Sequence, residues 1–309
     1  MTRNRPFKIG VFIPQVEEPW SGRTIGWEEL RATAMTAEAV GFDSVWLPDH
    51  LLYRFPGVHA QGVWDVWSLM PALAAVTSRV EIAPLVACAS FRNPALIAKM
   101  ADTIDEISEG RFILGLGAGW HEPEYDAFGF PFDHRVGRFA EALHIIHALL
   151  RTGYVDFEGQ FYSARNCELR PRGPRPQGPP ILIGSSSPRM MGLMAQYADF
   201  WNRDRINDVD MALDLEAQVD AACLASGRDP ATLGRTFGIQ VDLLNDKREA
   251  FIPRQWVREP WPLTGTPEEL AGQIRAFTRA RIDHLIIWLD PVSPTAIEAF
   301  APVLELLDR

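Results

Sequence analysis

Asp49 and His50 are the first residues in the sequence whose types and adjacency suggest chemistry. They follow the apolar run Ser44–Leu47, so we expect both side chains at the end of a strand. Histidine titrates near neutral pH, which makes His50 a candidate proton carrier with Asp49 beside it. The alternative interpretation is structural, with a capping aspartate and an ordinary hydrogen-bonded histidine.

A second candidate site joins the apolar run Ile181–Gly184 to a helix that should begin near Pro188. Small residues there let backbone N–H groups and serine hydroxyls approach an anion at the helix N-terminus, and an arginine adds positive charge. The alternative is a helix cap made of serines. The candidate cofactor-binding residues in this stretch are Gly184, Ser185, Ser186, Ser187 and Arg189.

A third candidate site follows the apolar run Phe112–Leu116. Glycine there permits the close approach of a ring or a phosphate, or forms a tight turn. The glycines do not open a helix as a dinucleotide motif requires, so they do not predict NAD. The candidate residues are Gly117, Ala118, Gly119 and Trp120.

Other chemistries lack support in the sequence. His121 and Glu122 have no third metal ligand at a convincing spacing, and His144 and His147 match no HExxH pattern, so we predict no metal site. No GxSxG motif supports a hydrolase. The formal net charge of −10 argues against general nucleic-acid affinity.

The elements that must position these residues alternate between strand and helix. This alternation predicts a closed parallel sheet, a (β/α)8 TIM barrel, with function at the C-terminal strand ends. An open doubly wound sheet is the rival, but it normally carries a Gly-rich fingerprint that is missing after Pro14. The predicted strands are Lys8–Pro14, Ser44–Leu47, Glu81–Val86, Phe112–Leu116, Ile181–Gly184, Asp199–Asn202, Thr236–Leu243 and His284–Leu289.

Residues 1–309 are expected to form a single domain with two irregular stretches. Residues 154–180 predict an inserted hairpin that turns at Gly159, followed by a Pro/Arg-rich loop, and residues 245–264 predict an irregular loop. Three scattered cysteines suggest a reducing cytoplasm, and no apolar run is long enough to cross a membrane.

Four segments, taken in order, resemble the luciferase-like monooxygenase superfamily, and within it the actinobacterial oxidoreductases that use coenzyme F420, a deazaflavin. They are GFDSVWLPDHL, FRNPALIAKMADTIDEISEGRFILGLGAGWHEPEYDAFGFPF, PPILIGSSSPRMMGLMAQYADFWN and TPEELAGQIRAF with IDHLIIW. The resemblance covers about residues 7–307 and implies a luciferase-like TIM barrel.

The resemblance also implies roles for single residues. Asp49 and His50 would lie near the reactive part of the cofactor ring, with His50 as the acid/base. Leu85 and Val86 match a bulge in which relatives have a non-prolyl cis peptide that supports the ring. Trp120 stands where a sugar-phosphate dehydrogenase branch has glutamate, which implies a more apolar substrate pocket. The loop 117–120 would contact the cofactor, and residues 184–187 would bind its phosphate.

The activity implied by the resemblance is hydride transfer between coenzyme F420 and a small organic substrate. The alternative is a monooxygenase that uses reduced FMN and O2, and a third reading is a non-catalytic flavin-binding homologue. The resemblance further implies a homodimer and a separate flavin or F420 reductase as partner. Candidate residues for an acidic cofactor tail are Arg135, Arg138, Arg172, Arg175 and Arg189.

Overall fold

The computed structural model describes residues 5–18, 21–243 and 261–309. A parallel sheet occupies its centre, and the strands of this sheet confirm the eight predicted runs with small shifts at their ends. They are β1 (Lys8–Phe12), β2 (Ser44–Leu47), β5 (Glu81–Pro84), β6 (Ala87–Cys88), β7 (Leu114–Gly117), β10 (Ile181–Gly184), β11 (Phe200–Arg203), β12 (Gly234–Asp242) and β13 (His284–Asp290).

The sheet closes on itself at the third barrel strand. Its strands follow the order β5-β2-β1-β13-β12-β11-β10-β7-β6, and β5 and β6 are consecutive halves of one strand. Since β5 pairs with β2 and β6 pairs with β7, the two ends of the sheet meet. A parallel bridge between Ile82 and Phe112 joins the same ends. The predicted (β/α)8 barrel is therefore confirmed.

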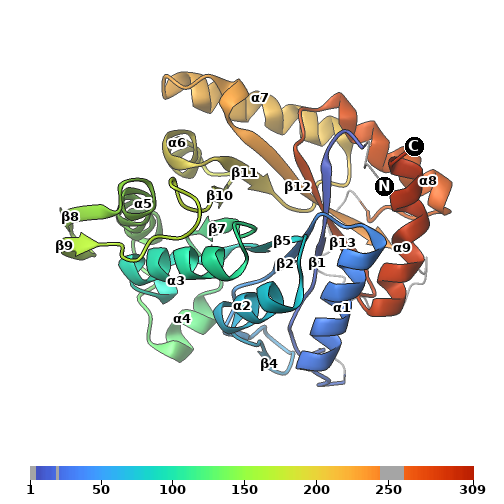
Figure 1. Ribbon diagram of the computed structural model, residues 1–309, viewed down its shortest axis with the longest axis horizontal. Helices are drawn as coiled ribbons and strands as arrows, with labels where there is room; N and C mark the ends of the chain where they lie inside the picture. Colours follow the sequence, from blue (N-terminus) through green and yellow to red (C-terminus); the bar gives the residue numbers. More distant parts are fainter. Residues whose placement is uncertain (1–4, 19–20, 244–260) are drawn as a thin grey trace.

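Helices surround the strands, as Figure 1 shows. They are α1 (Trp27–Val40), α2 (Val66–Val76), α3 (Pro94–Ile107), α4 (Glu122–Phe128), α5 (Arg135–Thr152), α6 (Pro188–Tyr197), α7 (Val209–Ala225), α8 (Pro267–Arg275) and α9 (Pro294–Leu307). Short 3-10 turns in the described chain include Ala89–Phe91, Pro230–Thr232 and Ala276–Arg279. None of the helices within these ranges is both long and apolar enough to cross a bilayer.

The helix ends follow local sequence signals. Gly41 ends α1 in the left-handed conformation at φ 115°, which glycine adopts without a Cβ clash. The Asn93 side chain accepts hydrogen bonds from the first turn of α3, with Pro94 at the helix start. At α8, Thr266 and Glu269 form a reciprocal capping box.

Two antiparallel hairpins lie outside the barrel sheet. β8 (Tyr154–Glu158) pairs with β9 (Ser163–Glu168), which confirms the predicted insertion, and this hairpin lies beside α5 at the left of Figure 1. β3 (Leu52–Tyr53) pairs with β4 (Gln61–Gly62) in the loop after β2. The sequence did not predict this second hairpin or the short helix α4. Most of the predicted irregular loop, 245–264, lies outside the described residues.

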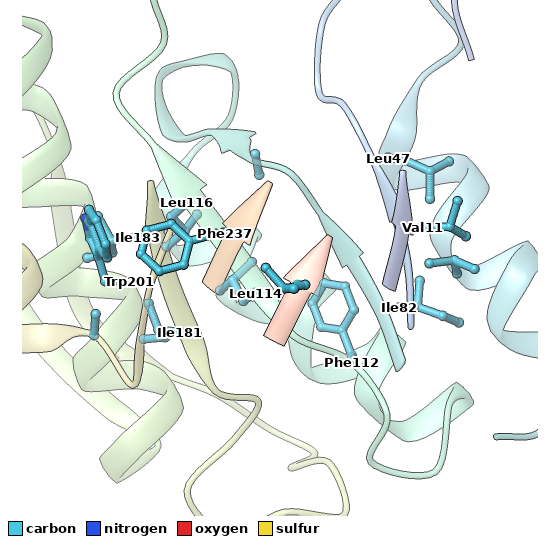
Figure 2. Packing of buried hydrophobic residues seen from close by; sticks show 14 of the residues in the cluster. Val11, Leu47, Ile82, Phe112, Leu114, Leu116, Ile181, Ile183, Trp201 and Phe237 are labelled. Atoms are coloured by element: carbon cyan, nitrogen blue, oxygen red, sulfur yellow. The ribbon is translucent and has the colours of Figure 1, made fainter. Parts of the chain in front are cut away.

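The strands are apolar on both faces because helices cover their outer side. The outer layer includes Val11, Leu47, Leu114, Ile183 and Phe237, shown in Figure 2. The alternate positions point into the barrel, where a second cluster fills the interior. That inner cluster consists of Phe12, Trp46, Ala83, Ile113, Leu182 and Ile286.

A small polar network lies inside the barrel near the N-terminal ends of β2 and β13. Trp46 Nε1 donates to Ser44 Oγ over 2.6 Å, and the same hydroxyl is 2.7 Å from His284 Nε2. His284 is 3% exposed, and burial lowers its pKa to about 3. The histidine therefore belongs to the core in its neutral form.

We expect His284 to make the fold sensitive to mild acid. An exposed histidine in the unfolded chain titrates near 6.5, far above the folded-state pKa of about 3. The unfolded chain then binds the extra proton, so stability is complete above pH 6.5. It is lost as pH falls toward 3, by up to roughly tenfold in the folded-to-unfolded ratio per pH unit.

Urea unfolding of the wild type and of His284→Gln at pH 7 and pH 5 measures this effect. The free energy of unfolding of the variant should improve relative to that of the wild type at pH 5. An equal difference between the two proteins at both pH values would contradict the expectation.

Candidate active site

A cavity of about 700 Å³ opens at the C-terminal ends of the barrel strands. Its size falls within the range of small-molecule and cofactor sites. Stacked rings of Phe12 and Trp288, with centroids 4.1 Å apart, contribute to its wall where it meets the packed barrel interior. Of the 13 residues predicted for the site, 12 line this cavity: Asp49, His50, Leu85, Val86, Gly117, Ala118, Gly119, Trp120, Gly184, Ser185, Ser186 and Ser187.

His50 lines the cavity, and its ring forms a hydrogen bond with Glu124 of α4. The His50 Nδ1 atom is 2.9 Å from Glu124 Oε1, and the Glu124 side chain is only 1% exposed. Glu124 Oε2 accepts the Leu51 N–H over 2.8 Å. The Tyr53 and Trp120 rings pack on His50, with centroids 4.3 Å and 5.5 Å away. The arrangement presents an oriented histidine to the cavity.

Asp49 is tied to other protein groups. Its Oδ2 accepts the Cys88 N–H over 3.0 Å and a hydrogen bond from Arg92 Nη1 over 2.8 Å. Arg92 also bonds Asp65, the residue that caps α2. Burial raises the pKa of Asp49, and the Arg92 charge opposes that rise. Asp49 thus anchors β6 to the end of β2. Of the two adjacent residues, His50 is the one that faces the cavity with its ring oriented by a carboxylate.

Burial also raises the pKa of the Cys88 thiol, to about 12. Its Sγ atom is 2.9 Å from the Tyr125 hydroxyl, which donates to the Ala118 carbonyl over 3.0 Å. Cys88 is therefore a neutral thiol at neutral pH, and its contacts fix the loop that follows β7.

The peptide between Leu85 and Val86 is cis, at the position predicted for the bulge. The Val86 side chain lies against glycines of β7 and β10. A Cβ on Gly117 would be 2.7 Å from Val86 Cγ2, and one on Gly184 would be 3.5 Å from either Val86 methyl group. Gly117 therefore has no room for a side chain, and at this position no side chain projects into the cavity.

The serine loop leaves the start of α6 open toward the cavity. Ser187 occupies the N-cap position in an extended conformation, but its side chain makes no capping hydrogen bond. Ser185 is turned inward: its Oγ faces the Met191 sulfur at 3.6 Å, and its carbonyl accepts from Trp201 Nε1. The serines are therefore not a simple helix cap, and backbone N–H groups at the helix start are oriented to favour an anion.

Arg135, at the first turn of α5, lines this end of the cavity. Its Nη1 donates to the Gly119 carbonyl over 2.9 Å, and its guanidinium lies over the Phe132 ring. Arg189 does not line the cavity: its side chain is exposed, and Nη2 would be 3.9 Å from a Cβ on Gly137 of α5. Arg189 of α6 was predicted to supply positive charge to the cofactor site. In the structure, Arg135 of α5 supplies positive charge to the cavity instead.

Two other arginines predicted to receive an acidic cofactor tail lie elsewhere. Arg175 Nε donates to the buried carboxylate of Asp105 over 2.9 Å, and Arg172 is 3.6 Å from Asp102 on the same helix, α3. These pairs hold the Pro/Arg-rich loop against α3, and neither arginine lines the cavity, so a contact with a cofactor tail stays a prediction for both. Arg138 is ion-paired within its own segment.

Glu124 and His121, which hydrogen-bond the loop after β2, were not predicted as its partners. Glu124 is 74 positions from His50. His121 Nε2 accepts the Arg54 N–H over 3.0 Å, and burial lowers the pKa of His121, which keeps it neutral as an acceptor. One usable signal was topological, because acidic residues after one barrel strand can meet a histidine that follows another.

Comparisons with known proteins agree with this architecture. A family profile described as luciferase-like monooxygenase matches residues 7–261. The pyrimidine monooxygenase RutA of Escherichia coli (strain SE11) is 35% identical over 330 aligned residues, covering 98% of this chain and 83% of that protein.

The RutA of Cronobacter turicensis is 35% identical over 208 residues, which is 62% of this chain. Over this segment the chain spans about half of the relative's length, 53%. An F420-dependent secondary alcohol dehydrogenase, solved in complex with an F420-acetone adduct, superposes with a TM-score of 0.79 at 20% identity, covering 97% of this chain and 99% of that one. At that identity the likeness shows the fold alone.

We expect Gly119 to be irreplaceable for packing as well as for conformation. Its φ of +73° strains any residue with a Cβ, and an added Cβ would lie 1.9 Å from the Tyr125 hydroxyl. Gly119→Ala should therefore lower the free energy of unfolding by about 3 kcal/mol or more, as strain and overpacking add.

Gly129→Ala is the matched control, because Gly129 has φ +76° and nothing within 4 Å of an added Cβ. This variant should lose only about 1 kcal/mol, the cost of strain. Urea unfolding of both variants checks the pair, and equal losses would argue against the packing role.

Proposed function

Because the chain belongs to the luciferase-like monooxygenase family and is therefore an oxidoreductase, we propose that it is a flavin-dependent monooxygenase that oxidises a small organic substrate with O2. The observation that carries this proposal is the 35% identity to a pyrimidine monooxygenase over 98% of the chain. The cavity at the strand ends is the place in which we locate the reaction.

The residues around the cavity fit a flavin. The open start of α6 at Ser185–Ser187 and the Arg135 guanidinium would hold the phosphate of FMN. Leu85, Val86 and the loop 117–120 would contact its ring, with glycine at 117 leaving room for close approach. Bound there, reduced FMN supplies the electrons that O2 activation requires.

The chain itself would bind and orient the substrate and move a proton. We propose His50 Nε2 as the acid/base atom, since Nδ1 is engaged by Glu124. Asp49, predicted beside it, would support the cofactor by anchoring β6.

The substrate class we propose is a planar heterocycle. Tyr53, Phe55 and Trp120 line the cavity beside His50, with the Tyr53 and Phe55 rings stacked at 5.7 Å. Flat aromatic walls favour flat ligands. The RutA relatives are named for pyrimidines, which belong to this class.

The second candidate function is hydride transfer with coenzyme F420. The resemblance of the sequence motifs to oxidoreductases that use F420 favours it, in a fold that this chain shares with an F420-dependent dehydrogenase. The same cavity residues would hold the deazaflavin, and His50 would keep its role. The same resemblance supports a homodimer and a separate reductase that delivers the reduced cofactor, and the scattered free cysteines support a cytoplasmic location.

We expect reduced FMN, added anaerobically, to quench the tryptophan fluorescence of the protein saturably, and coenzyme F420 to quench it weakly. Riboflavin, which lacks the phosphate, should bind at least about tenfold more weakly than FMN, a difference of ~1.4 kcal/mol. Saturable quenching by F420 with none by FMN would replace the first function by the second. Equal binding of FMN and riboflavin would contradict the phosphate site at α6.

We expect His50→Gln to lower turnover by roughly 10²- to 10⁴-fold, the usual contribution of a general acid or base. Cofactor affinity should be little changed, because His50 is proposed to move a proton of the substrate and not to hold the cofactor. His59→Gln is the control, because His59 is exposed in the same loop and does not line the cavity. Steady-state oxygen consumption with a pyrimidine substrate measures turnover, and unchanged turnover in His50→Gln would remove His50 as the acid/base.

A further inference from the structure

We propose that Glu124 is a positioning residue that fixes the tautomer of His50, with hydrogen on Nδ1 and a bare Nε2 toward the cavity. The inference deepens the proposed function and rests on it for the catalytic use of His50. Its structural content stands on the hydrogen bonds of two side chains and one backbone amide.

Both carboxylate oxygens of Glu124 are engaged by the loop after β2. Oε1 is 2.9 Å from His50 Nδ1, and Oε2 is 2.8 Å from the Leu51 amide nitrogen. The Leu52 N–H reaches the same Oε2 at 3.5 Å. The Glu124 side chain is 1% exposed, so water does not compete for these contacts.

The donor count assigns the hydrogen. An ionised carboxylate only accepts hydrogen bonds, so the imidazole nitrogen beside Oε1 must donate. A neutral imidazole with its hydrogen on Nδ1 has a lone pair on Nε2. His50 thus carries an acceptor on the ring atom that Glu124 does not hold.

The surroundings of the ring preserve this orientation. Tyr53 packs on the His50 ring at 4.3 Å with an interplanar angle of 36°, and Trp120 meets it edge-on at 5.5 Å. The nearby His121 has its Nε2 occupied by the Arg54 N–H, so that atom is not offered to His50. Ring packing and the carboxylate together hold one rotamer and one tautomer.

The consequence for chemistry is a base that is ready before substrate arrives. A substrate N–H or O–H bond breaks as the Nε2–H bond forms, and the electron pair of the broken bond stays on the substrate. The resulting imidazolium faces the Glu124 carboxylate at Nδ1, so its charge is stabilised without any rearrangement.

Glu124→Gln tests the assignment because it preserves shape and changes one donor. The Leu51 N–H still requires an acceptor, and glutamine has only one oxygen to offer it. The glutamine NH2 then faces His50 Nδ1, which must accept. The hydrogen moves to Nε2, and the tautomer is inverted.

The experiment is ¹⁵N NMR of histidine side chains in the ligand-free full-length protein, with the His50 signals assigned by their loss in His50→Gln. We expect a protonated Nδ1 and a bare Nε2 in the wild type, and the reverse in Glu124→Gln. Glu122→Gln, an exposed neighbour on the same helix, should match the wild type. A wild-type His50 protonated on Nε2, or an unchanged tautomer in Glu124→Gln, would overturn the proposal.

The wild-type spectrum decides the assignment even where the variant does not fold, and none of these spectra requires a cofactor or turnover. Turnover is measured separately: Glu124→Gln should lose about tenfold or more, with unchanged cofactor affinity. An inverted tautomer with normal turnover would support Glu124 as the positioning group and instead remove the catalytic role of His50.

Discussion

Barrel closure takes place at the third strand, where β5 pairs with β2, β6 pairs with β7, and the Leu85–Val86 peptide lies between the two pairings. A Cβ on Gly115 of β7 would be 2.2 Å from the Pro84 carbonyl oxygen, so the neighbouring backbones approach as closely as glycine allows. The Asp49 carboxylate secures the second half through the Cys88 N–H. The cavity wall therefore depends on the way in which the barrel closes.

The barrel and the position of its site followed from the sequence because both have local signals. Runs such as Ser44–Leu47 and Ile181–Gly184 are short, apolar and bounded by turn residues, and the structure reproduces both. In a parallel barrel the carboxyl ends of all strands lie at the same rim, so residues that directly follow strands were expected to lie close together. The bulge at Leu85–Val86 came from resemblance, since no periodicity reveals it.

The contacts that orient the site could not be predicted in the same way. Glu124 and His50 come from different loop regions, and their hydrogen bond depends on the position of α4. A helix of 7 residues is too short for a periodic apolar pattern to predict that position. Arginines were predicted by charge alone. Arg175 forms an ion pair with the buried carboxylate of Asp105 and therefore lies away from the cavity. Arg135 lines the cavity.

Buried acceptors and groups that favour an anion line the same cavity. Asp49 and Glu124 are buried carboxylates beside His50. The start of α6 and the Arg135 guanidinium favour an anion. In a protein with a net charge of −10, an anion in this cavity is therefore favoured by local groups and not by the overall charge.

The stacked Phe12 and Trp288 rings, with the packed inner cluster beneath them, close the barrel axis under the cavity. Side chains fill the barrel interior, so no ligand can pass along the barrel axis. Any ligand of the cavity must therefore enter and leave on the loop side. Of two ligands bound one above the other, the deeper one has to bind first and leave last.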